Sequence, residues 1–258
     1  MARHERLSTL LDLLAEREKL DVEEVAAELN VSAATIRRDL DHLAEQQLLT
    51  RTHGGAVAND LAYDLPLRYK TARHAPEKQR ISSAAAALAS NGMVVGFNGG
   101  TTTAGVARAL AMRADLSDAP GLTIVTNALN IAHELAVRPN MKIVVTGGVA
   151  RPQSFELSGP LATLVLSQLS LDLLFLGVDA LHPEAGAFAC HEGEADINRL
   201  MVASAARVVA VTDSSKLGRR AFARICDISD IHEVVTDSDA DPEITAALKA
   251  AGVPVQIA

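Results

Sequence analysis

Hydrophobic residues recur at helical spacing in three short stretches near the start of the chain. The apolar positions are Leu7, Leu10, Leu11 and Leu14 in the first stretch, Val22, Val25, Ala26 and Leu29 in the second, and Ala33, Ile36, Leu40 and Leu43 in the third. This spacing predicts three amphipathic helices. Asp21, with Glu24 three residues later, is a typical N-cap for the second helix, and Ser32 for the third. Three short helices with a tight turn before the third are typical of a helix-turn-helix.

A hairpin is predicted directly after the third helix. Residues 48–52 have the composition of a strand, Gly54 and Gly55 form a tight turn, and residues 56–57 return as a second strand. Such a hairpin is the wing of a winged helix-turn-helix domain, which we expect over residues 1–57. The alternative is a small helical domain for dimerisation or protein docking, which the three-helix spacing alone does not exclude.

From residue 81 onward the pattern alternates between helices and strands. A helix is predicted over residues 81–89. Strands are predicted over 93–97, 122–125, 142–146, 173–178, 208–212, 233–236 and 253–257. Helical runs lie between most of the strands, which is typical of a mostly parallel sheet covered by helices. We therefore expect an α/β domain over residues 81–258. Its longest apolar tract, residues 161–181, is interrupted by polar residues and predicts a buried helix followed by a buried strand.

Residues 58–80 separate these two patterns. Apolar periodicity lapses there, two prolines appear, and five Lys or Arg outnumber three Asp or Glu. This composition predicts a linker that lets two domains move relative to each other. Its basic residues leave two alternatives open, contact with a DNA backbone or simple solvation, and solvation is favoured.

Composition indicates a globular protein, since 48% of the 258 residues are hydrophobic and 22% are charged. Cys190 and Cys226 show no CxxC spacing and predict reduced thiols. The start of the chain lacks the apolar run of a signal peptide, so a cytoplasmic location is expected. We expect no metal and no cofactor.

Charge argues mildly against nucleic acid, because the net charge is −8 and residues 1–57 hold seven Lys or Arg against eleven Asp or Glu. The placement of the charges changes this picture. Thr35, Arg37 and Arg38 lie on the face of the third helix opposite its apolar positions, and Arg51 and His53 lie near the tip of the wing. The acidic residues fall mostly in the first two helices. This asymmetry favours DNA binding.

Polar and glycine-rich residues follow the ends of five predicted strands. They are Asn98, Gly99, Gly100, Thr101, Thr102 and Thr103 after the first strand, Thr126 and Asn127 after the second, Gly147 and Gly148 after the third, Asp179 after the fourth, and Asp213 to Lys216 after the fifth. Taken singly, each has a simple explanation as a turn or a helix cap. Ligands of parallel α/β sheets bind at the carboxyl ends of strands, and glycines before a helix N-terminus favour an anion. Together the loops predict a polar pocket for a phosphorylated ligand.

The kind of ligand is narrowed by missing motifs. Neither GxGxxG nor GxxxxGK[ST] occurs, which disfavours a dinucleotide or a nucleoside triphosphate and favours a small phosphorylated sugar or polyol. An enzyme, such as a sugar-phosphate isomerase or a CoA-transferase-like catalyst, is the rival interpretation. Isomerisation needs a well-placed general base, and Asp179 and Glu192 are the only evident candidates. We expect no enzyme activity. A purely structural protein leaves both the third helix and the pocket unexplained.

The segment VSAATIRRDLDHLAEQQLLTRTHGGAV closely resembles the DNA-binding signature of the DeoR family of bacterial repressors. The DNA-binding residues that the resemblance implies are Ser32, Thr35, Arg37, Arg38, Arg51 and His53. Arg37 or Arg38 grips guanine or the DNA backbone, and the sequence leaves open which of the two arginines does so, while the two wing residues touch phosphate. Asp39 is expected to fix an arginine or to cap locally.

The resemblance extends through the larger domain in the strings GGTTTAG, IVTNALNIA, VTGGVARPQSFELSGP, LFLGVDAL, GEADINRLM and VTDSSKLGRRAF. Sensor domains of this family are similar in fold to ribose-5-phosphate isomerase, and their effectors are commonly sugar phosphates. The resemblance implies that Gly100 and Thr101–Thr103 hold phosphate, that Lys216 pairs with the phosphate or a hydroxyl, and that Asp179 binds sugar hydroxyls. Asn98 stands where many relatives carry Asp. His191 and Glu192 are also placed near the pocket.

The expected protein is thus an effector-controlled repressor. Helix-turn-helix repressors bind paired half-sites of double-stranded operator DNA, so a homodimer or homotetramer is expected. The effector, a small phosphorylated sugar, changes the arrangement of domains or subunits and with it the affinity for DNA.

Overall fold

The computed structural model of this chain describes residues 3–17, 19–46, 48–58, 66–71, 73–116 and 118–258. The described residues form two compact units, which divide between Arg73 and His74. This division lies within the predicted linker.

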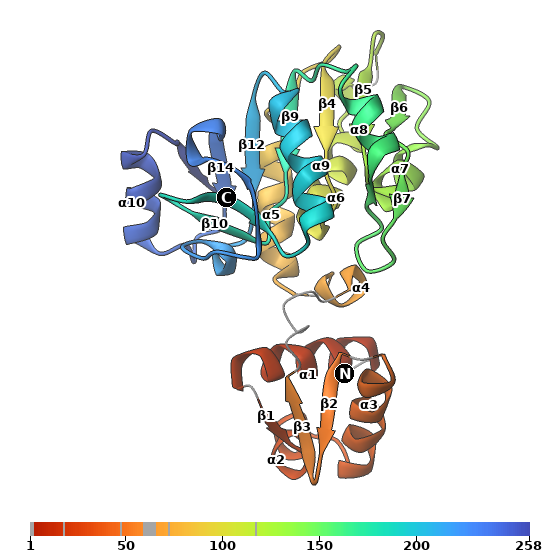
Figure 1. Cartoon of the computed structure of the whole chain (residues 1–258), viewed down its shortest axis with the longest axis vertical. Coiled ribbons are helices and arrows are strands. Elements are labelled where there is room, and N and C mark those ends of the chain that lie inside the picture. The colour runs from red at the N-terminus through yellow and green to blue at the C-terminus, as the bar shows by residue number, and fades with distance from the viewer. Residues whose placement is uncertain (1–2, 18, 47, 59–65, 72, 117) are drawn as a thin grey trace. The chain divides into compact units, whose positions relative to one another are not determined.

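The N-terminal unit is a winged helix-turn-helix (Figure 1). Its helices and strands are α1 (Arg3–Arg17), β1 (Lys19–Asp21), α2 (Val22–Glu28), α3 (Ala33–Glu45), β2 (Leu49–Thr52) and β3 (Gly55–Ala58). The strands form an antiparallel sheet in the order β1-β3-β2, so the predicted hairpin gains a third strand. β1 was not predicted because three residues are too few to show strand alternation. The tight turn lies at His53 and Gly54, one residue earlier than predicted, and Gly55 already belongs to β3.

Both predicted N-caps of this unit are confirmed. The Asp21 carboxylate accepts hydrogen bonds from the backbone N–H groups of Glu23 and Glu24, at 2.9 and 3.2 Å. The Ser32 hydroxyl accepts one from the N–H of Thr35 at 3.2 Å. The predicted apolar faces of the three helices meet in one core, which includes Leu7, Leu10, Leu11, Leu14, Val22, Val25, Ile36, Leu40 and Leu43. The apolar positions at helical spacing in the sequence are therefore the ones that are buried or partly buried in this unit.

A short helix within the predicted linker packs on this unit. It is α4 (Leu67–Lys70), and its Tyr69 is buried with the helix-turn-helix core. The backbone carbonyl of Tyr69 accepts a hydrogen bond from Ser8 Oγ at 2.8 Å. The phenolic hydroxyl of Tyr69 donates a hydrogen bond to Gln46 Oε1 at 2.7 Å. One helical turn is too short to show periodicity, which is why the composition of this stretch predicted a linker. Residues 59–65 of the predicted linker lie outside the described residues.

The end of the predicted linker is also helical. Residues 75–80 form the first half of α5 (Ala75–Ala86), which belongs to the C-terminal unit. Pro76 lies in its first turn, where a proline is compatible with a helix because the first N–H groups have no partner within it. The proline that predicted a linker thus marks the start of a helix.

The C-terminal unit contains a seven-stranded sheet in which every neighbouring pair is parallel. Its strands are β4 (Val94–Phe97), β5 (Leu122–Thr126), β6 (Met141–Val145), β9 (Leu173–Leu176), β12 (Val208–Val211), β14 (Glu233–Thr236) and β15 (Val255–Ile257). The predicted α/β fold with a parallel sheet is confirmed, and each of its seven strands coincides with a predicted one.

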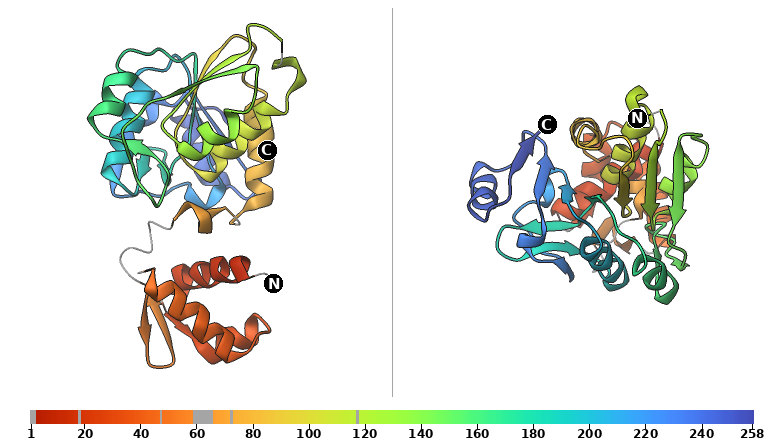
Figure 2. Two further views of the ribbon diagram at one scale, coloured as in Figure 1. Left: turned by 90° about the vertical axis from the view of Figure 1, so that its right-hand side faces the viewer. Right: turned by 90° about the horizontal axis from the view of Figure 1, so that it is seen from above.

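Helices cover both faces of this sheet (Figure 2). The helices α5, α6 (Thr101–Ala111) and α7 (Leu129–Leu135) cover one face. The other carries α8 (Pro160–Leu166), α9 (Glu192–Ala203) and α10 (Pro242–Ala250). Residues of β9 alternate between the two cores: Leu174 and Leu176 pack with α8 and α9, while Leu173 and Phe175 pack with α5 and α6. Burial on both faces explains why these strands are continuous apolar runs.

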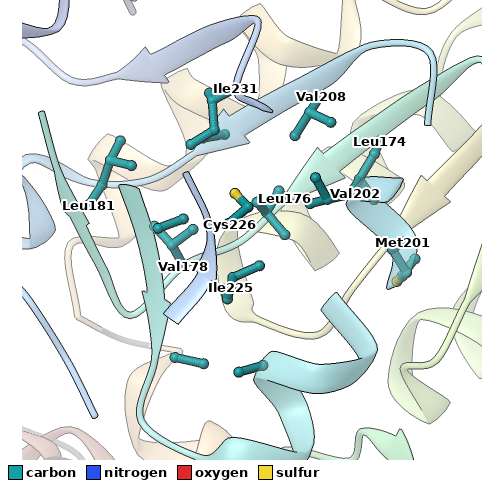
Figure 3. Close-up of a cluster of buried hydrophobic side chains, with 14 of the residues drawn as sticks. Leu174, Leu176, Val178, Leu181, Met201, Val202, Val208, Ile225, Cys226 and Ile231 are labelled. Atoms are coloured by element: carbon teal, nitrogen blue, oxygen red, sulfur yellow. The ribbon is translucent and has the colours of Figure 1, made fainter. Parts of the chain in front are cut away.

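The core on the α8 and α9 side is shown in Figure 3. Cys226 lies in it, and neither Cys190 nor Cys226 forms a disulfide within the described residues. Burial raises the pKa of the Cys226 thiol to about 12, so this thiol stays protonated at neutral pH. The tract predicted to be a buried helix is α8, but its Leu161 and Leu164 are 64% and 63% exposed, so only one side of this helix is buried. No helix of the described residues has both the length and the hydropathy needed to cross a membrane.

Smaller strands were not predicted. β7 (Val149–Ala150) and β8 (Leu157–Ser158) form a short hairpin, and β10 (Ala180–His182), β11 (Gly186–Ala189) and β13 (Ala223–Cys226) form an antiparallel sheet. With two to four residues each, these strands are too short for a pattern of alternation.

The strand order of the large sheet reverses between β4 and β9. From β4 the chain continues outward through β5 to β6, returns to β9 on the other side of β4, and ends with β12, β14 and β15. Phe97 of β4 and Phe175 of β9 are register partners, and their rings stack with centroids 5.4 Å apart. Ligands of doubly wound sheets bind outside the carboxyl ends of two such strands. The loops that begin at Asn98 and Gly177 leave the sheet there.

Candidate DNA-binding and effector-binding sites

The exposed face of α3 carries two arginines. Arg37 and Arg38 are exposed and Thr35 is half-buried, while the Ser32 hydroxyl lies 2.8 Å from that of Thr35. The Arg37 guanidinium contacts Glu23 of α2, with 2.7 Å between Nη2 and Oε1, and both side chains are more than half exposed. Arg38 Nε donates to the carbonyl of Ala34 within α3. Both positive charges therefore lie at the surface, but the charge of Arg37 is partly neutralised by the ion pair with Glu23.

Asp39 points away from this face. Its carboxylate is almost fully buried and accepts a hydrogen bond from Arg6 Nε at 2.5 Å, with Arg3 Nε at 3.6 Å from the other oxygen. The prediction that Asp39 fixes an arginine is confirmed. Because Arg3 and Arg6 belong to α1, the contact ties α3 to the first helix.

The wing is joined to α3 by Arg51. Its Nε donates to Asp41 Oδ1 at 2.7 Å, and its Nη1 donates to the carbonyl of Gly55. The side chain therefore orients the hairpin against α3. His53 is exposed at the turn of the hairpin.

At the edge of the large sheet, Asn98 joins the two loops at the point where the strand order reverses. Its Nδ2 donates to the carbonyl of Gly177 at 2.9 Å, and its Oδ1 accepts from the N–H of Gly177 at 2.7 Å. A carboxylate in this place has no donor for the carbonyl, so the amide is suited to the task. Both polar atoms of Asn98 thus have partners inside the protein, and the side chain positions the loops that the sequence predicts to bind an effector.

The loop after β4 leads into α6 with an unusual backbone. Gly100 is the N-cap residue, with a φ of +133° that side chains rarely adopt. No side chain among the described residues caps α6, so its first N–H groups retain the capacity to bind an anion. Thr103 Oγ1 donates to the carbonyl of Gly100 at 3.1 Å, while Thr102 is buried and Thr101 is half-buried.

The loops after β4 and β9 are in close contact. A Cβ atom on Gly177 would lie 3.1 Å from both the carbonyl oxygen of Gly99 and the methyl group of Thr103. A Cβ atom on Gly99 would lie 2.3 Å from Oε1 of Glu156. A side chain at position 99 would therefore collide with Glu156, which comes from a distant part of the sequence, unless Glu156 moved.

Glu156 was not predicted, yet its carboxyl group contacts two of the loops that the sequence predicts to bind an effector, those after β4 and β5. It accepts hydrogen bonds from Asn127 Nδ2, at 3.0 Å, and from the backbone N–H of Gly99. Burial, together with the neighbouring carboxylates of Glu194 and Asp179, raises the pKa of Glu156 to about 8. The only signal in the sequence is a single acid within the string SFELSGP, which does not show where the side chain lies.

The remaining predicted residues after β5 and β6 have separate roles. Thr126 Oγ1 accepts from the N–H of Ala128 at 3.0 Å, which is a local turn contact. Asn127 is fully buried, and its Oδ1 has no hydrogen-bond partner among the described residues. Gly148 approaches β8, since a Cβ atom there would lie 2.5 Å from the carbonyl oxygen of Ser158, whereas open space surrounds the Cβ position of Gly147.

The acids beyond β9 divide into buried and exposed groups. Asp179 Oδ2 accepts from the N–H of Cys190 at 2.9 Å. His191 caps α9, because its Nδ1 accepts from the N–H of Gly193. Glu192 is exposed, whereas Glu194, which was not predicted, is buried beside Glu156. The acid of this segment that reaches the site is therefore Glu194.

Lys216 lies in the 3-10 helix Ser214–Lys216 that follows β12, with its Nζ 3.9 Å from Oδ2 of Asp213. Burial opposes ionisation of Asp213, but the charge of Lys216, a hydrogen bond from the Ser215 hydroxyl and the nearby charge of Lys78 outweigh it and lower the pKa of this carboxyl group. Within the described part of the chain, Lys216 makes no hydrogen bond or ion pair with Thr101–Thr103.

A winged helix-turn-helix followed by a doubly wound α/β unit with a polar strand edge defines a ligand-responsive DNA-binding regulator. Residues 6–61 match the family model of the DeoR-like helix-turn-helix domain, and residues 73–238 match that of the DeoR C terminal sensor domain. The chain belongs to the DeoR family, as its motifs predict, and is a DNA-binding transcriptional regulator.

Relatives match almost the whole chain. The HTH-type transcriptional regulator GlpR of Haloferax volcanii is 35% identical over 252 residues, which are 97% of this chain and 96% of that protein. The glycerol-3-phosphate regulon repressor of Escherichia coli K12 is 32% identical over 238 residues, or 92% of each chain. Both are regulators by name. Among solved structures, ribose 5-phosphate isomerase A of Methanocaldococcus jannaschii has a TM-score of 0.40 and 20% identity, covering 55% of this chain and 54% of its own.

Proposed function

We propose that this protein represses transcription from paired operator half-sites and leaves them when a small phosphorylated sugar or polyol binds where β4 and β9 diverge. The observation that carries the proposal is the uncapped start of α6 behind Gly99 and Gly100, at the point where the strand order reverses. One relative is named for a glycerol-3-phosphate regulon, which supports a phosphorylated polyol as the effector class. Paired half-sites require at least a homodimer, and a homotetramer meets the same need.

On the DNA side, the proposed contacts are Ser32, Thr35, Arg37, Arg38, Arg51 and His53. Control by an effector requires that the effector bind the DNA-free form more tightly than the DNA-bound form. On the effector side, we propose that backbone N–H groups of Gly100 and α6 and the Thr101 hydroxyl hold phosphate, with Asp179, Asn127 and Lys216 around the attached chain.

The effector class can be tested by thermal unfolding of the full chain with phosphorylated sugars and polyols, each compared with its unphosphorylated counterpart. A ligand at about 100 times its dissociation constant stabilises the folded form by about 2.7 kcal/mol, which raises the melting temperature by several degrees. The same compound is expected to release labelled operator DNA. Equal shifts from phosphorylated and unphosphorylated partners would contradict a phosphate site.

Lys216→Ala is expected to weaken the response to the effector about tenfold, because a cation at the edge of the site is lost, while operator affinity stays unchanged. The measurement is the effector concentration that releases half of the labelled operator. Lys249→Ala, at the end of α10, removes an equal charge away from the site and serves as the control. An unchanged response of Lys216→Ala would remove this residue from the site.

Glu23→Gln is expected to strengthen operator binding about threefold at low salt, because it releases Arg37 from an exposed ion pair and removes a negative charge from the DNA-facing surface. The effect should shrink as salt increases. Fluorescence anisotropy with an operator selected from random DNA measures it. Glu28→Gln, on the same helix but paired with Arg17, is the matched control. Equal effects of the two variants would show that Arg37 plays no special part.

A further inference from the structure

The β7–β8 hairpin inserts an acid into the anion-binding loop. Glu156 precedes β8 directly, and its carboxyl group accepts a hydrogen bond from the N–H of Gly99. The hairpin is fixed across the edge of the sheet by two backbone hydrogen bonds, from Leu129 to the carbonyl of Phe155 at 3.0 Å and from Leu157 to the carbonyl of Asn127 at 2.7 Å. The proposed phosphate and this carboxyl group therefore share one loop.

The groups around Glu156 come from four elements. Gly99 follows β4, Asn127 follows β5, Asp179 follows β9, and Glu194 lies in α9. Glu194 is paired with Arg151, with 2.9 Å between its Oε1 and Nη1. Two further acids thus lie beside Glu156, and the ion pair given for Arg151 is with Glu194. No group of three His, Cys, Asp or Glu side chains in the described part of the chain is arranged to hold a metal ion.

These surroundings make the uncharged form of Glu156 the stable one. Burial is the largest cause of the raised pKa, followed by the carboxylate of Glu194, and two hydrogen bonds compensate only partly. With a pKa of about 8, the group is mostly protonated at pH 7. An uncharged carboxylic acid offers one O–H donor, which a carboxylate lacks.

A second feature of the site indicates a missing partner. Asn127 is fully buried, and while its Nδ2 donates to Glu156 and to the carbonyl of Leu157, its Oδ1 has no partner among the described residues. Buried polar atoms without partners are rare in folded proteins and call for an explanation such as a bound group. A hydroxyl of a polyol chain attached to the phosphate can supply the donor.

We propose that Glu156 binds the effector as an uncharged acid, with its O–H donating to an oxygen of the phosphoryl group that the Gly99–Gly100 loop and the start of α6 hold. This inference rests on the proposed function and adds to it a residue and a condition, namely that the bound state carries a proton on Glu156. Ionisation of Glu156 would put a carboxylate against a dianion in a buried site, where like charges repel strongly. Affinity for a dianion is then lost as pH rises.

The experiment is a titration of the full chain with sulfate, which is a dianion throughout, from pH 6.5 to pH 9.5 at constant ionic strength. The folded pKa lies above the ordinary value of 4.5, so the uncharged form dominates below about pH 8 and is lost above it. The dissociation constant is expected to be level up to about pH 7.5 and to increase above pH 8, approaching tenfold per pH unit. The Glu156→Gln variant, which keeps an uncharged donor, is expected to bind with no such dependence.

A second variant addresses the same point without altering Glu156. Glu194→Gln removes the neighbouring negative charge together with its ion pair to Arg151, so the pKa of Glu156 falls and the loss of affinity begins at a lower pH. This variant keeps the test decisive if Glu156→Gln does not fold. Melting temperatures without ligand, measured over the same pH range, separate ligand binding from stability.

Three outcomes contradict the proposal in different ways. Parallel pH profiles of the native chain and Glu156→Gln would show that Glu156 carries no linked proton. An affinity that increases with pH would show that the anion displaces Glu156 into water instead of binding beside it. If neither sulfate nor any phosphorylated sugar binds at any pH, the phosphate site itself is wrong, and the role of Glu156 is wrong with it.

Discussion

The Gly55→Ala variant is expected to lose the folded N-terminal unit and, with it, operator binding. Gly55 pairs with Asp21 of β1 and Thr52 of β2, and an added Cβ atom would lie 1.8 Å from the carbonyl oxygen of Leu20. The Cβ atom is attached directly to the Gly55 backbone and the oxygen belongs to the Leu20 backbone, so relief requires separating β1 from β3. We expect a cost of about 3 kcal/mol or more, a large part of the roughly 5–15 kcal/mol that stabilises a typical domain.

The neighbouring glycine provides the control for this variant. Gly54 has a φ of +89°, and its nearest contact to an added Cβ atom is 3.9 Å away, at Asp21 Oδ2. Gly54→Asn therefore meets only the modest cost of a left-handed conformation, about 1 kcal/mol, which asparagine tolerates well. Urea unfolding of the full chain, monitored together with operator binding, compares the two. Equal destabilisation would contradict the steric explanation.

The second large effect is expected from the double variant Arg37→Ala, Arg38→Ala. Both guanidinium groups lie on the exposed face of α3, and neither is buried in the core, so the fold should survive. Loss of two DNA contacts is expected to weaken operator binding by about a hundredfold and to lower the salt dependence of the binding constant by about two counterions. Anisotropy titrations at several salt concentrations measure both quantities.

The single arginine variants separate two roles that the sequence leaves open. The variant that loses a base contact should bind operator and scrambled DNA more equally, whereas the variant that loses a phosphate contact should bind both more weakly by the same factor. Arg108→Ala, on α6 in the other unit, controls for net charge. Normal operator binding by the double variant would contradict the assignment of α3 as the recognition helix.

The sequence was sufficient for the regular elements of the fold. Strands such as β9 and β12 are buried on both faces, so they are continuous apolar runs that no other element of this length produces. The helices of the N-terminal unit have one buried face and show it at every third or fourth position. Two helical segments within the predicted linker were missed, the single turn of α4 and the first half of α5, because stretches this short show no such contrast.

The sites were predicted only as far as local sequence allows. Residues after strand ends were located because strand boundaries are visible in the sequence. Glu156 and Glu194 were missed, because the burial of an acid and its importance depend on the residues around it. Here these residues come from four separate loops or helices. The hydrogen bonds of Asn98 could not be predicted from local sequence either, because its partner Gly177 is 79 positions away.

That separation has a consequence during synthesis. The ribosome completes β4, β5 and β6 well before β9, yet the proposed effector site is complete only when β4 and β9 lie side by side and Asn98 binds Gly177. Contacts between distant residues form late because a long loop must first close. A nascent chain that ends before residue 173 therefore has its glycine loop without the rest of the proposed site, and we expect the regulator to respond to an effector only after most of it has been translated.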